Sequence, residues 1–127
     1  MPSATTLAGV LSHLTTVERH WFGTVLGGVT RAMPFDPAWP DGDWNTALVT
    51  GTELLADYRR ACDDSDAVIN DLAMDSVGAQ TDGDYTLRWA MTHVFGDTVR
   101  HAGQADILRE LTDGKRGWWP EWAISER

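Results

Sequence analysis

Residues 87–111 decide the fold: they read LRWAMTHVFGDTVRHAGQADILREL and predict one long helix. Thr86, directly before this segment, is suited to be the N-cap, and the pair Asp113-Gly114 after it supplies the stop. Neither this segment nor the rest of the chain shows the apolar–polar alternation that marks a strand. The sequence therefore predicts an all-α fold.

Two further helices are predicted upstream. The first begins near Thr5 or Thr6 and ends at Gly27-Gly28. Its apolar face consists of Leu7, Val10, Leu11, Leu14, Val17, Trp21 and Val25. The second runs from about Thr46 to Leu72. Its inward-facing residues are predicted to be Leu48, Thr52, Leu55 and Tyr58.

The segments between and after these helices are predicted to be irregular. Residues 32–45 carry three prolines, and the segment around Gly78 and Gly83 is polar. The C-terminal tail has three tryptophans within residues 117–122. We expect this tail to fold back over the helices, because three exposed indoles would form an apolar patch of the kind that monomers avoid. The whole chain, residues 1–127, has a length that suits a single domain with one core.

The composition excludes several classes of function. A net charge of −9 without a basic patch argues against a nucleic-acid partner. There is no uncharged stretch long enough to span a bilayer and no leader-like N-terminus, so we expect a cytoplasmic protein without a membrane partner. Cys62 is the only cysteine, and its acidic neighbours are expected to raise the pKa of its thiol, which favours a buried structural role over a nucleophilic one.

The four histidines lie on the first and third predicted helices. His93, Asp97 and His101 recur every four residues, and residues at i and i+4 share one face of a helix. His13 and His20 lie on the first helix. A polar stripe inside an apolar face needs partners, and metal sites in bundles are built from ligands on facing helices. The spacing leaves two interpretations open: a metal held between helices, or core histidines that are hydrogen-bonded to Asp97.

Two motifs resemble a branch of the DinB-like superfamily. Residues 13–22, HLTTVERHWF, resemble its HL-x-x-VER-x-WF signature, and residues 100–110, RHAGQADILRE, resemble its last helix. The likeness extends over about residues 5–114. The branch includes mycothiol-dependent maleylpyruvate isomerases and thiol S-transferases, which are four-helix bundles with a divalent metal. The resemblance therefore implies a metal-binding helical bundle.

The resemblance also implies roles for individual residues. His13, Asp97 and His101 are the implied metal ligands, with zinc as the expected metal and nickel or iron as alternatives. Asp97 departs from the branch, which generally has glutamate there, and Gln104 stands where the nearest branch often has histidine. His93, one turn before Asp97, is the implied catalytic residue, which orients a ligand or moves a proton.

The resulting prediction is a metal-dependent thiol transferase or isomerase. The metal would lower the pKa of a low-molecular-weight thiol such as mycothiol, and the thiolate would attack a small electrophile. His20, Arg19 and Arg100 are predicted to bind the substrate. Salt bridges of the two arginines to Glu18 or Asp106 are the structural alternative.

Two other functions stay open at this point. The first is a non-catalytic DinB-like binding or stress-response module with a degenerate metal site, which the departures at Asp97 and Gln104 favour. The second is metal-assisted hydrolysis, with water in place of the thiol. Metal binding distinguishes the non-catalytic module from the two enzymatic functions. Dependence on a thiol distinguishes the thiol transferase from the hydrolase.

The number of predicted helices differs from that of the resembling branch. Its members carry about forty residues before the motif at His13, and these supply the first of the bundle's helices. Here twelve residues precede His13. Three helices leave an apolar groove that the tryptophan-rich tail, an upstream segment or a partner chain would cover. We expect a homodimer, because twofold pairing is the commonest way to bury such a face.

Overall fold

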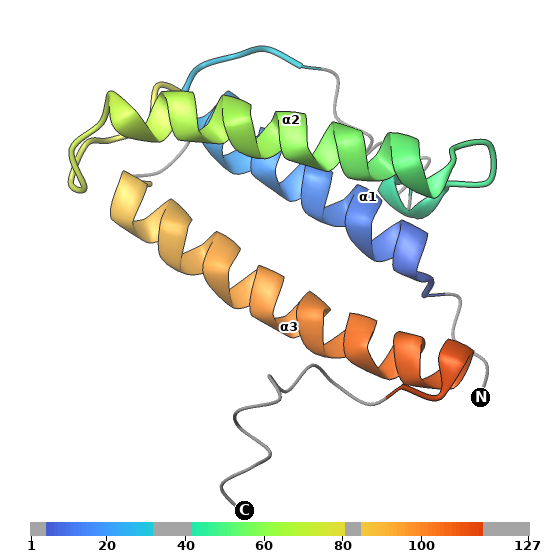
Figure 1. Cartoon of the computed structure of the whole chain (residues 1–127). Coiled ribbons are helices and arrows are strands. Elements are labelled where there is room, and N and C mark those ends of the chain that lie inside the picture. Colours follow the sequence, from blue (N-terminus) through green and yellow to red (C-terminus); the bar gives the residue numbers. More distant parts are fainter. Residues whose placement is uncertain (1–4, 32–41, 81–84, 116–127) are drawn as a thin grey trace, which may run out of the picture.

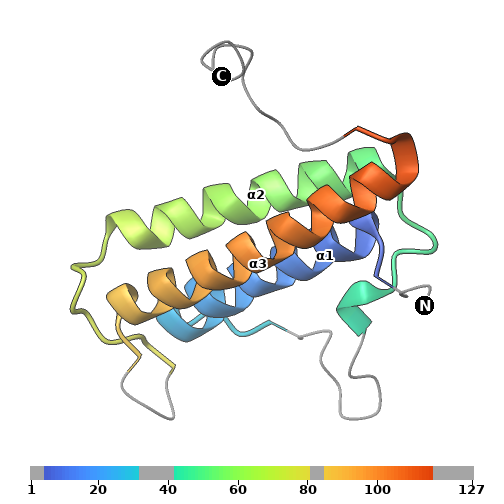
Figure 2. The same ribbon diagram turned by 90° about the horizontal axis from the view of Figure 1, so that it is seen from below.

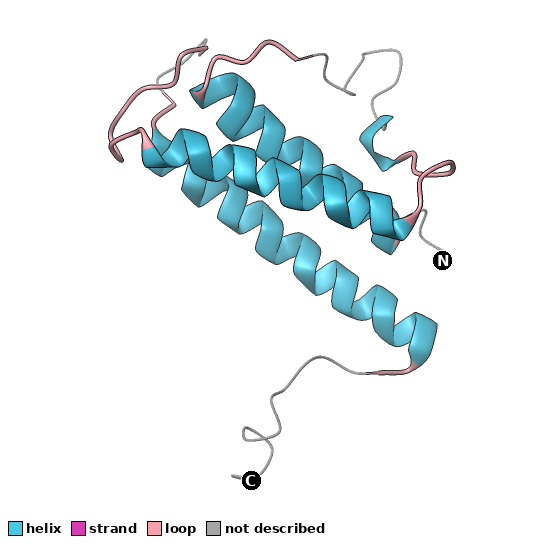
Figure 3. Ribbon diagram, turned by 45° about the horizontal axis from the view of Figure 1, so that its top comes forward, coloured by secondary structure: helices cyan, strands magenta, loops and turns pink. Residues whose placement is uncertain are grey.

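The computed structural model describes residues 5–31, 42–80 and 85–115. Its elements are α1 (Leu7–Glu18), η1 (Arg19–Leu26), η2 (Gly42–Trp44), α2 (Gly51–Asn70) and α3 (Leu87–Asp113). η1 continues α1 as a π-helix, and η2 is a short 3-10 helix. Apart from an isolated bridge between Val77 and Thr86, the described residues are helical or irregular (Figure 3). The all-α fold predicted from the sequence is confirmed.

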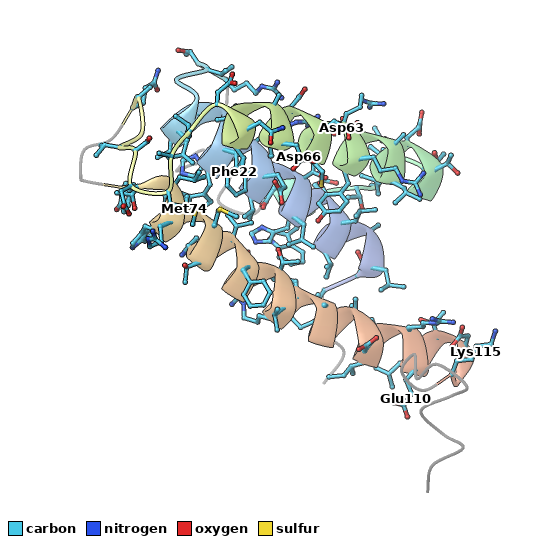
Figure 4. The ribbon with its side chains drawn as sticks, turned by 60° about the vertical axis from the view of Figure 1, so that its left-hand side comes forward. Phe22, Asp63, Asp66, Met74, Glu110 and Lys115 are labelled. Atoms are coloured by element: carbon cyan, nitrogen blue, oxygen red, sulfur yellow. The ribbon has the colours of Figure 1, made fainter. Side chains whose placement is uncertain are left out.

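α1 packs against both α2 and α3. It lies behind these two helices in Figure 1, and Figure 2 shows α3 in front of α1. The buried core is formed by residues of α1, η1 and α3: Val17, Phe22, Leu26, Leu87, Ala90 and Val94. Figure 4 shows Phe22 in this interior. Because the core fixes α1 and η1 against α3, polar side chains on the same faces of these helices are brought together as well.

The ends of α1 and α3 follow local capping signals that the sequence predicted. Thr6 Oγ1 accepts a hydrogen bond of 2.9 Å from a backbone N–H of the first turn of α1. Thr86 does the same at 3.2 Å for α3. At the end of α3, Gly114 adopts a left-handed φ of 73°, and its N–H donates to the carbonyl of Glu110.

The start of α2 differs from the prediction. The helix begins at Gly51 and not at Thr46, because Thr50 and Glu53 form a capping box. The Glu53 N–H donates to Thr50 Oγ1, and the Glu53 carboxylate accepts from the Thr50 N–H at 2.9 Å. Leu48 lies before the helix and is 98% exposed. Thr52 and Leu55, which lie within the helix, are exposed as well, so three of the four positions predicted to face inward are exposed.

The π-helix η1 shifts the residues that face the core. The Gly27 N–H donates to the carbonyl of Phe22, five residues back, at 2.9 Å. The wider winding begins at Arg19, and Phe22, five residues after Val17, lies in the core, where the helical period had predicted Trp21. Trp21 is half-buried and packs against the core from its edge.

No described helix is long and apolar enough to cross a membrane. The tail that contains the three tryptophans and most of the proline-rich loop lie outside the described residues. The folding back of the tail therefore stays a prediction, as does the single domain over residues 1–127.

Candidate metal centre

Two helices bring three predicted ligands together. His13 comes from α1, and Asp97 and His101 come from successive turns of α3; one ligand atom from each lies within 4.8 Å of the others. Nε2 of His13 lies 3.4 Å from Oδ2 of Asp97, and Nε2 of His101 lies 3.6 Å from Oδ1. The two imidazoles meet edge to face, with ring centroids 4.7 Å apart. Each imidazole thus turns its Nε2 toward the same carboxylate.

η2 holds His13 from the other side of its ring. Nδ1 of His13 lies 2.5 Å from Oδ2 of Asp43. Trp44 stacks on the imidazole, with centroids 4.9 Å apart and planes inclined by 18°. Gly9 of α1 makes room for this indole, since a Cβ at that position would lie 2.8 Å from a ring carbon of Trp44. Both the face and the Nδ1 edge of His13 are therefore occupied by η2.

The hydrogen bonds of His101 fix its tautomer. A guanidinium nitrogen of Arg100 lies 3.0 Å from Nε2 of His101. A guanidinium only donates, so Nε2 must accept. The ring proton is then on Nδ1, which donates to Oε1 of Gln104 at 2.7 Å. Gln104, a departure from the resembling branch, therefore orients a candidate ligand.

Arg100 also donates to Oδ1 of Asp97 at 2.7 Å. Its guanidinium thus contacts two of the three candidate ligands, Asp97 and His101. The charge of a carboxylate and the lone pair of an imidazole attract a cation at this point. The Arg100 side chain is 63% exposed, so it can turn away when another cation binds.

The other two histidines contact aromatic rings farther along the same interface. Trp21 contacts His20 and His93, with centroid separations of 5.0 and 4.8 Å. Trp89 stacks on His93 at 4.9 Å with planes inclined by 9°. Tyr85 contacts both indoles. The structure therefore places His20 and His93 in an aromatic cluster, and not among the three candidate ligands.

His20 is the more buried histidine of this cluster. Burial lowers the pKa of His20, and the nearby His93 lowers it further. Nδ1 of His20 is buried and has no hydrogen-bond partner among the described residues. Its surroundings therefore favour the neutral imidazole.

Arg19, predicted to bind substrate, is engaged by α2. Its guanidinium donates two hydrogen bonds, of 2.8 and 2.7 Å, to Asp57, which lowers the pKa of that carboxyl group. This pairing matches the structural alternative, with Asp57 in place of Glu18 as the partner. Glu18 instead accepts from Ser65 at 2.7 Å. Burial raises the pKa of the Cys62 thiol, with Glu18 as a further cause, so the structure does not activate this cysteine.

Sequence reasoning missed Asp43, Trp44 and the contact of Gln104 with His101. Asp43 lies thirty residues from His13 along the chain, in a predicted loop, and no helical spacing connects the two. Gln104 did carry a signal, because it follows His101 by three residues, and such residues are neighbours on a helix.

Similarity to a known family extends over most of the chain. The model of a family described as mycothiol-S-transferase matches residues 1–114. The chain belongs to this family. The match agrees with the DinB-like resemblance, and it relates the chain to transferases that use mycothiol. It covers α1, α2, α3 and η2, and with them the whole candidate metal centre. No curated protein and no solved structure matches the sequence significantly.

Proposed function

We propose that this chain is a metal-dependent mycothiol S-transferase, with His13, Asp97 and His101 as ligands of a divalent metal ion. One observation carries the proposal: two imidazole Nε2 atoms face one carboxylate, in a chain of a mycothiol transferase family. Isomerisation assisted by the same thiol is the related activity that this site would support.

The donor set suits zinc first. Imidazole nitrogens and carboxylate oxygens are both zinc ligands, and three protein ligands leave a position open for a substrate. Nickel and iron accept the same donors. The contact of Arg100 with Asp97 and His101 supports the fit, because it places positive charge against these donors.

A divalent ion held here would lower the pKa of a bound thiol and so supply the thiolate, which is the nucleophilic form. Arg100 would leave Asp97 and bind a carboxylate of the electrophile. His93 is exposed and lies one turn before Asp97, and we assign it the uptake and return of a proton. His20 and its aromatic neighbours would contact the carbon skeleton of the substrate.

In the transfer reaction, the bonds that form and the bonds that break balance without a further reactant. The sulfur electron pair forms a new S–C bond, and the leaving group departs with its bonding pair. The thiol proton goes to solvent or to His93. In the isomerisation, the thiolate is released again after the rearrangement, so the thiol is regenerated.

The test is conjugation of mycothiol to small electrophiles, beginning with 1-chloro-2,4-dinitrobenzene, whose thioether product is followed by its absorbance. The zinc-loaded chain is expected to accelerate conjugation, and chelation or His101→Ala should abolish the acceleration. His93→Ala should keep the metal and lower kcat. A loaded chain that hydrolyses esters without thiol would indicate metal-assisted hydrolysis, and a chain that binds no metal would favour the non-catalytic module. Either result would contradict the proposal.

We also propose that the chain forms a homodimer. A groove of about 280 Å³ is lined by residues of α1, η1, α2 and α3, among them Phe22, Ile69 and Phe95. Phe95 is 72% exposed. Val99, one turn further along α3, is exposed as well. A symmetric partner would bury this surface. Light scattering should give about twice the chain mass of 14.0 kDa, and the mass of one chain would contradict the dimer.

A further inference from the structure

Asp43 in η2 determines which nitrogen of His13 carries the proton. Its Oδ2 lies 2.5 Å from Nδ1 of His13. An ionised carboxylate only accepts hydrogen bonds, so the imidazole must donate from Nδ1. A neutral imidazole with its proton on Nδ1 has a bare lone pair on Nε2. That is the atom which faces Asp97 at 3.4 Å.

Burial of Asp43 lowers the stability of the fold, and packing alone does not explain why a carboxylate is buried here. The residue is 3% exposed, and its second oxygen, Oδ1, is buried without a hydrogen-bond partner among the described residues. A buried polar atom without a partner lowers the stability of the fold. An apolar side chain in this place would avoid that cost. Among the described residues, the contact with His13 is therefore the feature that accounts for a carboxylate at this position.

The rest of η2 fixes the orientation of the same ring. Trp44 covers one face of His13, and the absence of a side chain at Gly9 lets the indole approach α1. The hydrogen bond from Nδ1 sets the rotation of the ring in its plane, and the stacked indole sets the tilt of that plane. Together they leave Nε2 directed at Asp97.

We propose that Asp43 is a positioning residue that presents His13 as an Nε2 ligand of the metal centre. The inference rests on the proposed function, since it assigns a role toward the same metal. A carboxylate that accepts from the far nitrogen of a ligand histidine orients the ring and makes it more basic. Loss of such a partner typically weakens metal binding about 10- to 100-fold.

The experiment compares Asp43→Asn with Asp63→Asn in the full chain. Both variants remove one negative charge, but Asp63 is exposed on α2 and faces away from α3 (Figure 4). Zinc affinity is measured by competition with a chelating dye. The histidine tautomers of the metal-free chain are read from ¹⁵N–¹H correlations. Asp43→Asn is expected to weaken zinc binding 10- to 100-fold and to mix the two tautomers of His13. Asp63→Asn should change neither quantity.

Two further measurements keep the inference testable if Asp43→Asn loses its helical circular dichroism. The wild-type spectrum alone should place the His13 proton on Nδ1, and a proton on Nε2 would overturn the inference. Gly9→Ala should weaken zinc binding by displacing Trp44, whereas Gly51→Ala, where a Cβ meets nothing within 4 Å, should not.

The possible outcomes separate this inference from the proposed function. Zinc binding within twofold of wild type in a folded Asp43→Asn, with the His13 tautomer unchanged, would overturn the role of Asp43 and leave the metal site intact. A wild-type chain that binds no zinc would contradict the metal site itself. In that case the tautomer spectra still decide whether Asp43 sets the proton of His13.

Discussion

His13 and His101 face each other across the interface of α1 and α3, and His20 and His93 lie farther along, where η1 packs on α3. In the first pair, each Nδ1 has an oxygen partner, Asp43 or Gln104, and each Nε2 faces Asp97. In the second pair, the imidazoles pack against indoles, and Nδ1 of His20 has no hydrogen-bond partner among the described residues.

This difference shows that helical spacing alone does not distinguish a ligand histidine from a packed one. Each pair has one histidine on α1 or its continuation η1 and the other on α3. Hydrogen bonds at Nδ1 give the first pair a defined tautomer and a directed lone pair, as a metal requires. Ring packing gives the second pair an apolar environment that favours the neutral form of His20. The residues that make the difference are supplied by η2 and by the next turn of α3.

The largest effect is expected when a ligand of the first pair is removed. His101→Ala should weaken zinc binding by more than about 100-fold. Removing a metal ligand should weaken binding more than removing a residue that only hydrogen-bonds a ligand. Helical circular dichroism should be mostly retained, since alanine favours a helix. Isothermal titration with zinc measures the change.

The matched control for this prediction is His93→Ala in the second pair. It removes an imidazole from the same helix, two turns before His101, and should leave zinc affinity within about twofold. Equal losses in His93→Ala and His101→Ala would contradict the distinction between the two pairs.

A smaller effect is expected from the two arginines. Arg100→Ala should strengthen zinc binding about fivefold, or about 1 kcal/mol, because the guanidinium competes with the metal for Asp97 and His101. Arg19→Ala should leave zinc affinity unchanged and lower the urea midpoint of unfolding, because Arg19 pairs with Asp57. Weaker zinc binding in Arg100→Ala would show that Arg100 supports the metal centre and does not compete for it.

The smallest effect concerns the pH dependence of stability. The pKa of His20 is lower in the folded chain than its ordinary value of 6.5. Its contribution to stability is therefore complete above pH 6.5 and is lost as the pH falls through the folded pKa. His20→Phe, which keeps a ring that cannot ionise, should lose less stability than wild type between pH 7.5 and pH 5. Urea unfolding of the metal-free chain measures this, and equal losses in both proteins would contradict the neutral, packed state of His20.

Much of the fold follows from local signals in the sequence. Thr6, Thr86 and Gly114 cap α1 and α3 as predicted, because capping depends on a few neighbouring residues. The core residue Phe22 was missed, since η1 departs from the period of 3.6 on which the prediction depended. The early start predicted for α2 ignored the capping box of Thr50 and Glu53.

The candidate site was predictable only where it lies on helices. Asp97 and His101 share a face by spacing, and the resemblance to a DinB-like motif added His13 from another helix. Asp43 approaches His13 through the tertiary packing of η2 on α1, which no local pattern encodes. The contact that decides the tautomer of His13 therefore required the structure.

The most direct test of the central claim is the metal content of the untagged chain, purified without chelator and measured by inductively coupled plasma mass spectrometry. The proposed site predicts close to one zinc, nickel or iron ion per chain, and loss of that ion in His101→Ala. A chain that carries no metal and takes up no added zinc would contradict the metal centre, and with it the proposed transferase mechanism.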